Sequence, residues 1–209
     1  MGLTDPDRLF PVEPRLRDIA RALFDTVEKL PIISPHGHCD PRWFAENRRF
    51  PNPAELLVIP DHYLVRMLVS QGVTHAQLGI PGRDGDASET DPRVVWRLFA
   101  SHYHLFRGTP SAMWLDHSFE HLFDIDDILS ADTADSYYDH IDGCLGRNGF
   151  RPRALFEQFN VEVLATTDAA TDELAWHGLL RDSGWDGHVI TTYRPDATID
   201  PEFEGFAAN

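Results

Sequence analysis

The sequence lacks the features of membrane and disulfide-rich proteins. Its 209 residues contain no run of 18 or more apolar residues, which excludes an ordinary membrane-spanning helix. The first residues also lack the basic and then apolar pattern of a signal peptide. Cys39 and Cys144 are the two cysteines, too few for a disulfide framework, so we expect a cytoplasmic protein in a reducing compartment.

Positive charge is scarce as well. The chain has 18 Lys and Arg residues against 34 Asp and Glu residues, a net charge of −16, and Lys29 is its only lysine. Such a charge disfavours binding to a nucleic-acid backbone. An anionic substrate would need a local arginine, and the arginine fork suits a carboxylate.

The first 80 residues predict helices around one buried strand. Apolar residues at Ile19, Leu23 and Val27 recur every four positions and predict a helix over 14–29. An apolar run predicts a strand over 30–35, and the proline-rich stretch 40–60 predicts a loop with a short helical turn. Asp61 is typical of the N-cap of a helix that ends at Ser70.

A polar loop is expected over 81–92, and residues 93–148 have a helical pattern throughout. Gly108-Thr109-Pro110 ends one helix and begins the next, and Thr133 begins another. The aromatic residues favour a small helical core over a cofactor site. They are Trp96, Phe99, Tyr103, Phe106, Trp114, Phe119 and Phe123.

The last part predicts a βαβ unit. A helix over 152–159 precedes a strand over 161–167, which ends at Asp168. A helix over 172–181 and a strand over 188–193 follow, and short connections of this kind indicate a parallel sheet. We therefore expect an α/β protein with an N-terminal part (1–80), a helical insertion (81–150) and a strand-rich part (151–209).

The sequence His36-Gly37-His38 follows the first predicted strand. Residues two apart in a strand share a face, so both imidazoles can form half of a metal site at its carboxyl end. Asp40 adds a carboxylate nearby, and Cys39, at the opposite parity, would face away from both rings. The alternative is a loop with two solvated or capping histidines.

Several motifs together resemble the uronate isomerase family of the amidohydrolase superfamily, in the order and spacing of that family. They are Pro35-His36-Gly37-His38-Cys39-Asp40-Pro41, Asp61-His62-Tyr63, Gly108-Thr109-Pro110-Ser111 with Trp114-Leu115, Arg153-Ala154-Leu155-Phe156, Phe159-Asn160-Val161-Glu162-Val163, Ala165-Thr166-Thr167-Asp168 and Tyr193-Arg194-Pro195-Asp196. The resemblance implies a metal-dependent hydrolase-like (β/α)8 barrel, of which this chain holds about the first three strands with a helical insertion between strands one and two.

The resemblance also implies an activity and a metal. Family members interconvert aldo- and keto-uronic acids, such as glucuronate with fructuronate and galacturonate with tagaturonate. His36 and His38 correspond to metal ligands, with zinc the favoured divalent ion. The family completes the site with an aspartate from strand eight, which lies outside this sequence, so we expect activity only with the complete barrel.

Further site residues follow from the same motifs. His62 and Tyr63 would bind substrate oxygens, with Tyr63 a possible acid or base, and Arg194 would hold the sugar acid. Asp168 and Asp40 would support the ligands without binding the metal. The alternatives are a salt bridge of Arg194 with Asp196, a helix cap at Asp168, and a helix-start histidine with a packed tyrosine at His62-Tyr63.

Two other functions stay open at this point. A metal-dependent hydrolase of the same superfamily would share the first-strand histidines, but His62-Tyr63 and the insertion motif favour the isomerase. An inactive fragment is the third interpretation, because the chain holds half of a metal site. The expected partner is a small sugar acid, with no nucleic acid and no membrane, in a chain that can form a homo-oligomer.

Overall fold

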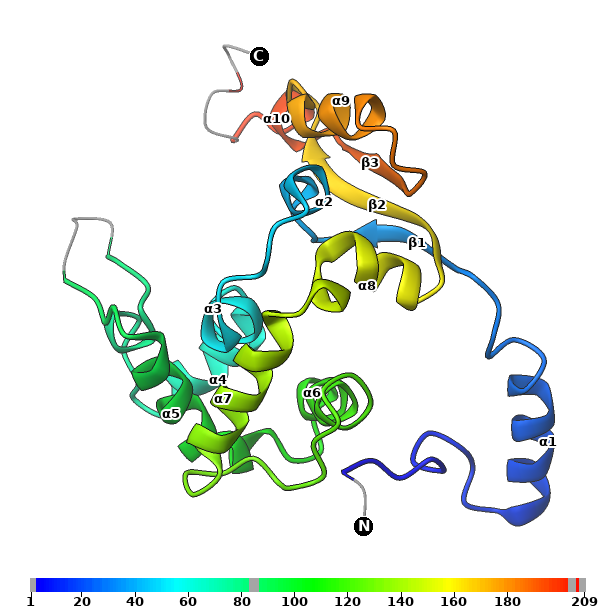
Figure 1. The fold of residues 1–209 in the computed structure, drawn as a ribbon, viewed down its shortest axis with the longest axis vertical. Helices are drawn as coiled ribbons and strands as arrows, with labels where there is room; N and C mark the ends of the chain where they lie inside the picture. Colours follow the sequence, from blue (N-terminus) through cyan, green and yellow to red (C-terminus); the bar gives the residue numbers. More distant parts are fainter. Residues whose placement is uncertain (1–2, 83–86, 203–205, 207–209) are drawn as a thin grey trace. The chain divides into compact units, whose positions relative to one another are not determined.

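The computed structural model describes residues 3–82, 87–202 and 206. The chain forms two compact units, Met1–Arg21 with Phe50–Arg147 and Ala22–Arg49 with Asn148–Asn209 (Figure 1). The division into three parts, 1–80, 81–150 and 151–209, stays a prediction. Residues 83–86 of the predicted loop 81–92 lie outside the described residues.

A parallel sheet of three strands organises the second unit. The strands β1 (Ile32–Gly37), β2 (Val161–Ala169) and β3 (His188–Arg194) lie in the order β1-β2-β3, so the predicted parallel βαβ unit is confirmed. The strand β1 begins two residues later than predicted. Pro31 has no N–H to donate to a neighbouring strand. Ile32 is the first residue to do so, with a hydrogen bond to the carbonyl of Asn160, just before β2.

Helices cover one face of this sheet. They are α2 (Pro41–Glu46), α8 (Pro152–Gln158) and α9 (Ala175–Asp182), and Figure 1 shows them beside the strands. Phe44, Phe156 and Leu180, one residue from each helix, form the buried centre, and Leu164 and Val189 pack against it from β2 and β3. The apolar side chains of these helices therefore define the covered face.

The first unit is helical in its described residues. Its longer helices are α3 (Pro53–Leu57), α4 (His62–Ser70), α5 (Pro92–Ser101), α6 (Pro110–His121) and α7 (Ala134–Leu145), whereas α1 (Pro14–Phe24) spans the boundary between the units and α10 (Asp196–Ile199) follows β3. Short 3₁₀ turns lie at Ala76–Leu78 and Tyr103–Phe106, and a third, Asn148–Phe150, belongs to the second unit. Within the described ranges, every helix is too short or too polar to cross a membrane.

Two predicted helix starts are confirmed by their caps. The carboxylate of Asp61 accepts hydrogen bonds from the backbone N–H groups of Tyr63 (2.8 Å) and Leu64 (3.2 Å). The hydroxyl of Thr109 accepts one from the N–H of Ala112. A side-chain oxygen at the N-cap satisfies donors that have no partner inside the helix, which is why these residues fix where α4 and α6 begin.

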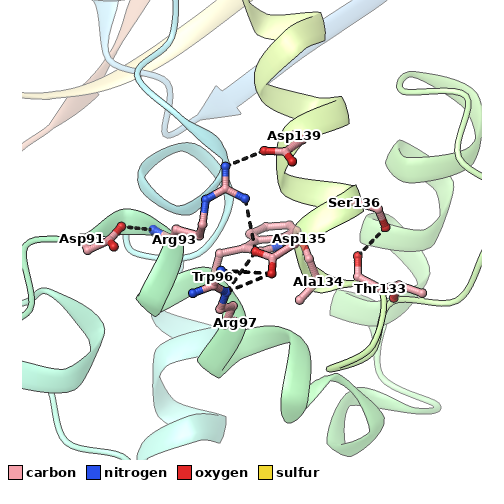
Figure 2. Close-up of polar contacts among 9 residues, drawn as sticks. All are labelled: Asp91, Arg93, Trp96, Arg97, Thr133, Ala134, Asp135, Ser136 and Asp139. Atoms are coloured by element: carbon pink, nitrogen blue, oxygen red, sulfur yellow. Dashed lines mark hydrogen bonds and ion pairs between the residues drawn. The ribbon is translucent and has the colours of Figure 1, made fainter.

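The helices α5 and α7 contact each other through a buried hydrogen bond and through exposed ion pairs (Figure 2). Trp96 is fully buried and its indole N–H donates to the carbonyl of Ala134 at 2.9 Å. Outside it, the guanidinium of Arg97 binds both carboxylate oxygens of Asp135, at 2.9 and 3.0 Å. Hydrogen bonds from Arg97, together with Arg93, hold the pKa of Asp135 below its usual value.

Three local predictions are wrong. The helix α1 ends at Phe24 rather than at residue 29, and the N–H groups of Thr26 and Val27 then donate to the carbonyls three residues back, as in turns. The stretch 40–60 contains two short helices, each begun by a capping residue and a proline, rather than one turn. Trp114 is 60 % exposed and lies outside the aromatic core that Trp96 and the other predicted aromatic residues form.

The two tryptophans give a matched test of the helical core. We expect Trp96→Phe to lower the free energy of unfolding by about 1–3 kcal/mol, because it leaves a cavity and removes a buried hydrogen bond. Trp114→Phe in α6 should change it by less than about 0.5 kcal/mol, as expected for an exposed site. Urea unfolding of both variants, followed by circular dichroism, checks this, and equal losses would contradict the assigned burial.

Candidate active site

The two histidines of the His-x-His motif converge at the carboxyl end of β1. Their Nε2 atoms lie 2.9 Å apart, in a hydrogen bond between the rings, and both side chains are exposed. Two nitrogens that share one zinc ion at about 2.0–2.1 Å each are at most ~4.2 Å apart. His36 and His38 therefore fit a common divalent ion.

Two histidines are too few to form a metal site by themselves. Among the residues that the structure describes, no group of three or more His, Cys, Asp or Glu side chains is arranged to hold a metal ion. A closed zinc site has four ligands and a catalytic site has three from the protein. Any site at His36 and His38 needs at least one further ligand.

A bulge in β1 sets the direction of the histidine rings. Ser34 is paired with Leu164 and Gly37 with Thr166, so β1 has one more residue than β2 between these pairs. At Gly37 the two strands lie so close that a Cβ atom would be 2.8 Å from the carbonyl oxygen of Ala165. Glycine is needed here for the space, since an alanine side chain would push the strands apart.

The thiol of Cys39 lies on the helix-covered face of the sheet, away from the two histidines. Gly37 is paired with Thr166, and Cys39, two residues further, packs against the Phe44, Phe156 and Leu180 cluster. Burial raises the pKa of the Cys39 thiol, which disfavours the thiolate form that binds metals. The residues on either side of Gly37 alternate to the other face, where we find the imidazoles.

Asp168 lies on the covered face of the sheet, opposite the face that carries the histidines. The hydroxyl of Thr166 is 2.6 Å from the Asp168 carboxylate and 2.9 Å from Nε2 of His177 in α9. All three side chains are largely buried, and among the described residues Nδ1 of His177 finds no hydrogen-bond partner. The supporting role of Asp168 stays a prediction. The sequence alone does not single out His177, because nothing but its position in the helix after β2 indicates that it lies beside Thr166.

Arg194 lies on the open face together with the histidines. It is paired with Ala169, and residues 165, 167 and 169 alternate to the side away from the helices. Its Nε atom is 3.4 Å from the carboxylate of Asp196, so the strand-end salt bridge is present, although both side chains are about half exposed. The guanidinium thus stays accessible from solvent at the carboxyl end of β3.

The remaining predicted site residues lie at helix starts. Asp40 caps α2, where its carboxylate accepts a hydrogen bond from the N–H of Arg42 at 2.8 Å. His62 and Tyr63 begin α4 in the other unit, and their ring centroids are 4.1 Å apart. Both side chains are exposed, Tyr63 by 57 % of its surface, which leaves its hydroxyl open to a ligand.

A hollow of about 450 Å³ lies in the first unit. Arg8, Tyr103, Arg107 and Asp116 contribute to its lining, and the Tyr103 hydroxyl donates to the Asp116 carboxylate at 2.7 Å. Burial raises the pKa of Asp116 above its usual value. The described residues that line it include none of the predicted site residues.

Comparison with known proteins identifies the family. The sequence profile of the glucuronate isomerase family matches residues 15–209. The chain belongs to the glucuronate isomerase family. It is 58 % identical over 209 residues to the uronate isomerase of Mesorhizobium japonicum and 54 % identical over 208 residues to that of Rhizobium meliloti. The two alignments span the whole of this chain but only 45 % and 44 % of the length of these relatives.

Solved structures agree on the fold. The crystal structure of glucuronate isomerase from Caulobacter crescentus superposes with a TM-score of 0.93 at 52 % identity, over 100 % of this chain and 43 % of that one. The uronate isomerase of Thermotoga maritima superposes with a TM-score of 0.84 at 24 % identity, which supports the fold alone. The α/β arrangement with three parallel strands thus matches part of a glucuronate isomerase.

The close approach at Gly37 leads to a test of stability. We expect Gly37→Ala to lower the free energy of unfolding by about 1–3 kcal/mol, because β1 must move away from β2 to make room for the methyl group. The control is Gly143→Ala in α7, where a Cβ atom meets nothing within 4 Å and helix propensity should add about 0.5–1 kcal/mol. Urea unfolding of both variants, followed by circular dichroism, measures the change, and a Gly37→Ala variant as stable as the wild type would contradict the assigned contact.

Proposed function

We propose that this chain is part of a uronate isomerase that interconverts aldo- and keto-hexuronic acids, D-glucuronate with D-fructuronate and D-galacturonate with D-tagaturonate. One observation carries the proposal. Two imidazoles that fit a common ion and an accessible guanidinium lie on the same open face of a parallel sheet, at the carboxyl ends of their strands. In β/α barrels that end of the strands carries the catalytic groups.

The reaction moves a proton between C2 and C1 through an enediol. Arg194 binds the sugar carboxylate at C6, so that binding energy from this remote group orients the reacting end of the substrate. The salt bridge with Asp196 is exposed and easily exchanged for a substrate carboxylate, because a bidentate arginine–carboxylate contact is the stronger interaction.

His62 and Tyr63 act on the substrate oxygens in this proposal. Both lie in the first turn of α4, where the positive end of the helix dipole favours negative charge on a bound group. The imidazole of His62 donates a hydrogen bond to the developing enediolate oxygen, and the phenol of Tyr63 holds or returns the proton.

A divalent metal, with zinc the favoured ion, belongs at His36 and His38. When bound, it supplies a positive charge that stabilises the oxygen next to the reacting carbons. The two imidazoles would hold the ion at the carboxyl end of β1, together with at least one further ligand. Asp40 and Asp168 support the ends of β1 and β2.

The same proposal extends to the architecture of the whole protein. The three strands would form the first part of a (β/α)8 barrel, with the helical insertion 81–150 between its first two strands. Such a protein works in the cytoplasm, as a homo-oligomer or alone. Support comes from the matched relatives, of which this chain spans less than half the length.

Isomerisation in deuterium oxide tests the activity directly. The full-length protein, loaded with Zn²⁺ and incubated with D-glucuronate, should form a ketose that carries deuterium at C1. The products are measured by nuclear magnetic resonance and mass spectrometry. A ketose without deuterium would support isomerisation and contradict exchange of the proton with solvent, whereas no ketose from either uronate would overturn the proposed function.

Arg194 gives a prediction with a matched control. We expect Arg194→Gln to raise KM for the uronate by about 10-fold or more, with a smaller effect on kcat, because it removes a charged contact to the carboxylate that is worth about 1.5–3 kcal/mol. Asp196→Asn removes only the salt-bridge partner and should leave KM within about 2-fold. Equal effects of both substitutions on KM would indicate that the salt bridge, and not the substrate, explains Arg194.

A further inference from the structure

Two threonine hydroxyls bind the backbone on either side of His36. The hydroxyl of Thr167 in β2 donates to the carbonyl oxygen of Gly37 at 2.9 Å. The hydroxyl of Thr192 in β3 donates to the carbonyl oxygen of Pro35 at 3.0 Å. The two carbonyls belong to the residues directly before and after His36 in the chain.

Both hydrogen bonds lie at the bulge of β1, where its pairing with β2 is irregular. The pairing with β2 is regular at neither Pro35 nor His36, since the register shifts between Ser34 and Gly37. Pro35 also has no N–H to hold it in a ladder. The two hydroxyls therefore add side-chain hydrogen bonds to the backbone of β1 where its pairing with β2 is irregular.

The two threonines act from the same side of the sheet. Thr167 and Thr192 are paired in register, so both side chains project from the open face, as Arg194 does two residues further along β3. Because the strand order is β1-β2-β3, the side chain of Thr192 reaches across β2 to Pro35. The small side chain of Ala165, which is 3 % exposed, leaves room on this face of β2.

We propose that Thr167 and Thr192 are positioning residues, which fix the His36-His38 pair relative to Arg194 by holding the carbonyls of Pro35 and Gly37. The proposal rests on the proposed function, since it takes the histidines as metal ligands and Arg194 as the carboxylate group. The hydroxyls set the distance between the metal end and the acid end of the substrate site. They touch neither end themselves.

A metal-binding measurement tests this without relying on activity. The full-length protein and its variants are stripped of metal, and the Zn²⁺ dissociation constant is measured by competition with a chromophoric chelator, below the unfolding temperature of every variant. We expect Thr167→Val with Thr192→Val to raise that constant by about 10- to 100-fold, the range seen when residues that support metal ligands are changed. We also expect kcat for the uronate to fall at least as much.

Two matched variants separate positioning from simple stability. Thr167→Ser with Thr192→Ser keeps both hydroxyls and should return the dissociation constant to within about 3-fold of the wild type. Thr191→Val removes a hydroxyl that faces the other side of β3, and it should leave metal affinity unchanged. A purely structural role would lower the unfolding temperature of the double valine variant and leave the Zn²⁺ affinity of its folded form unchanged.

A further variant distinguishes the two ways of failing. His36→Gln should lose stoichiometric Zn²⁺, whereas His188→Gln, at the amino end of β3, should keep it. If His36→Gln binds Zn²⁺ as the wild type does, the proposed metal site and the positioning role both fall. If it loses Zn²⁺ but the double valine variant binds as tightly as the wild type, only the positioning role is overturned.

Discussion

The arrangement of the candidate site depends on how closely β1 lies against β2. At Gly37 the gap between the two strands admits no side chain, since a Cβ atom would be 2.8 Å from the carbonyl oxygen of Ala165. This contact fixes the end of β1, and one extra residue just before it forms the bulge. A bulge redirects the side chains beside it, and here the redirected residue is His36. The shared face of His36 and His38, whose Nε2 atoms lie 2.9 Å apart, therefore follows from a backbone constraint.

Two consecutive threonines in β2, Thr166 and Thr167, form hydrogen bonds on opposite faces of the sheet. Thr166, which is buried, contacts the Asp168 carboxylate, Nε2 of His177 and the carbonyl oxygen of Ile190 on the covered face. Thr167 points the other way and donates to Gly37. Alternation along a strand makes this division unavoidable. One residue thus anchors β2 to β3 and α9, and the next anchors it to the strand that carries the histidines.

Local signals in the sequence predict a good part of this fold. The hydrophobic runs predict the three strands, and Asp61 and Thr109 predict two helix starts, because capping depends only on neighbouring residues. The same signal, Asp40-Pro41 and Asn52-Pro53, marks the starts of α2 and α3 inside the proline-rich stretch, where proline density alone predicts a loop. The face of Asp168 and the contact of Thr192 with Pro35 depend on strand register, a long-range property, so no local pattern indicates them.

The open face of the sheet changes in character along its strands. Nearer the amino ends it presents aliphatic side chains, with Ile33 and Ile190 63 % and 51 % exposed in this chain. At the carboxyl ends it presents His36, Thr192 and Arg194. Apolar side chains stabilise a sheet only when they are covered, whereas imidazole and guanidinium groups must reach solvent or substrate. The open face thus presents apolar side chains at one end of its strands and polar or charged side chains at the other, and the two threonines lie where these parts meet.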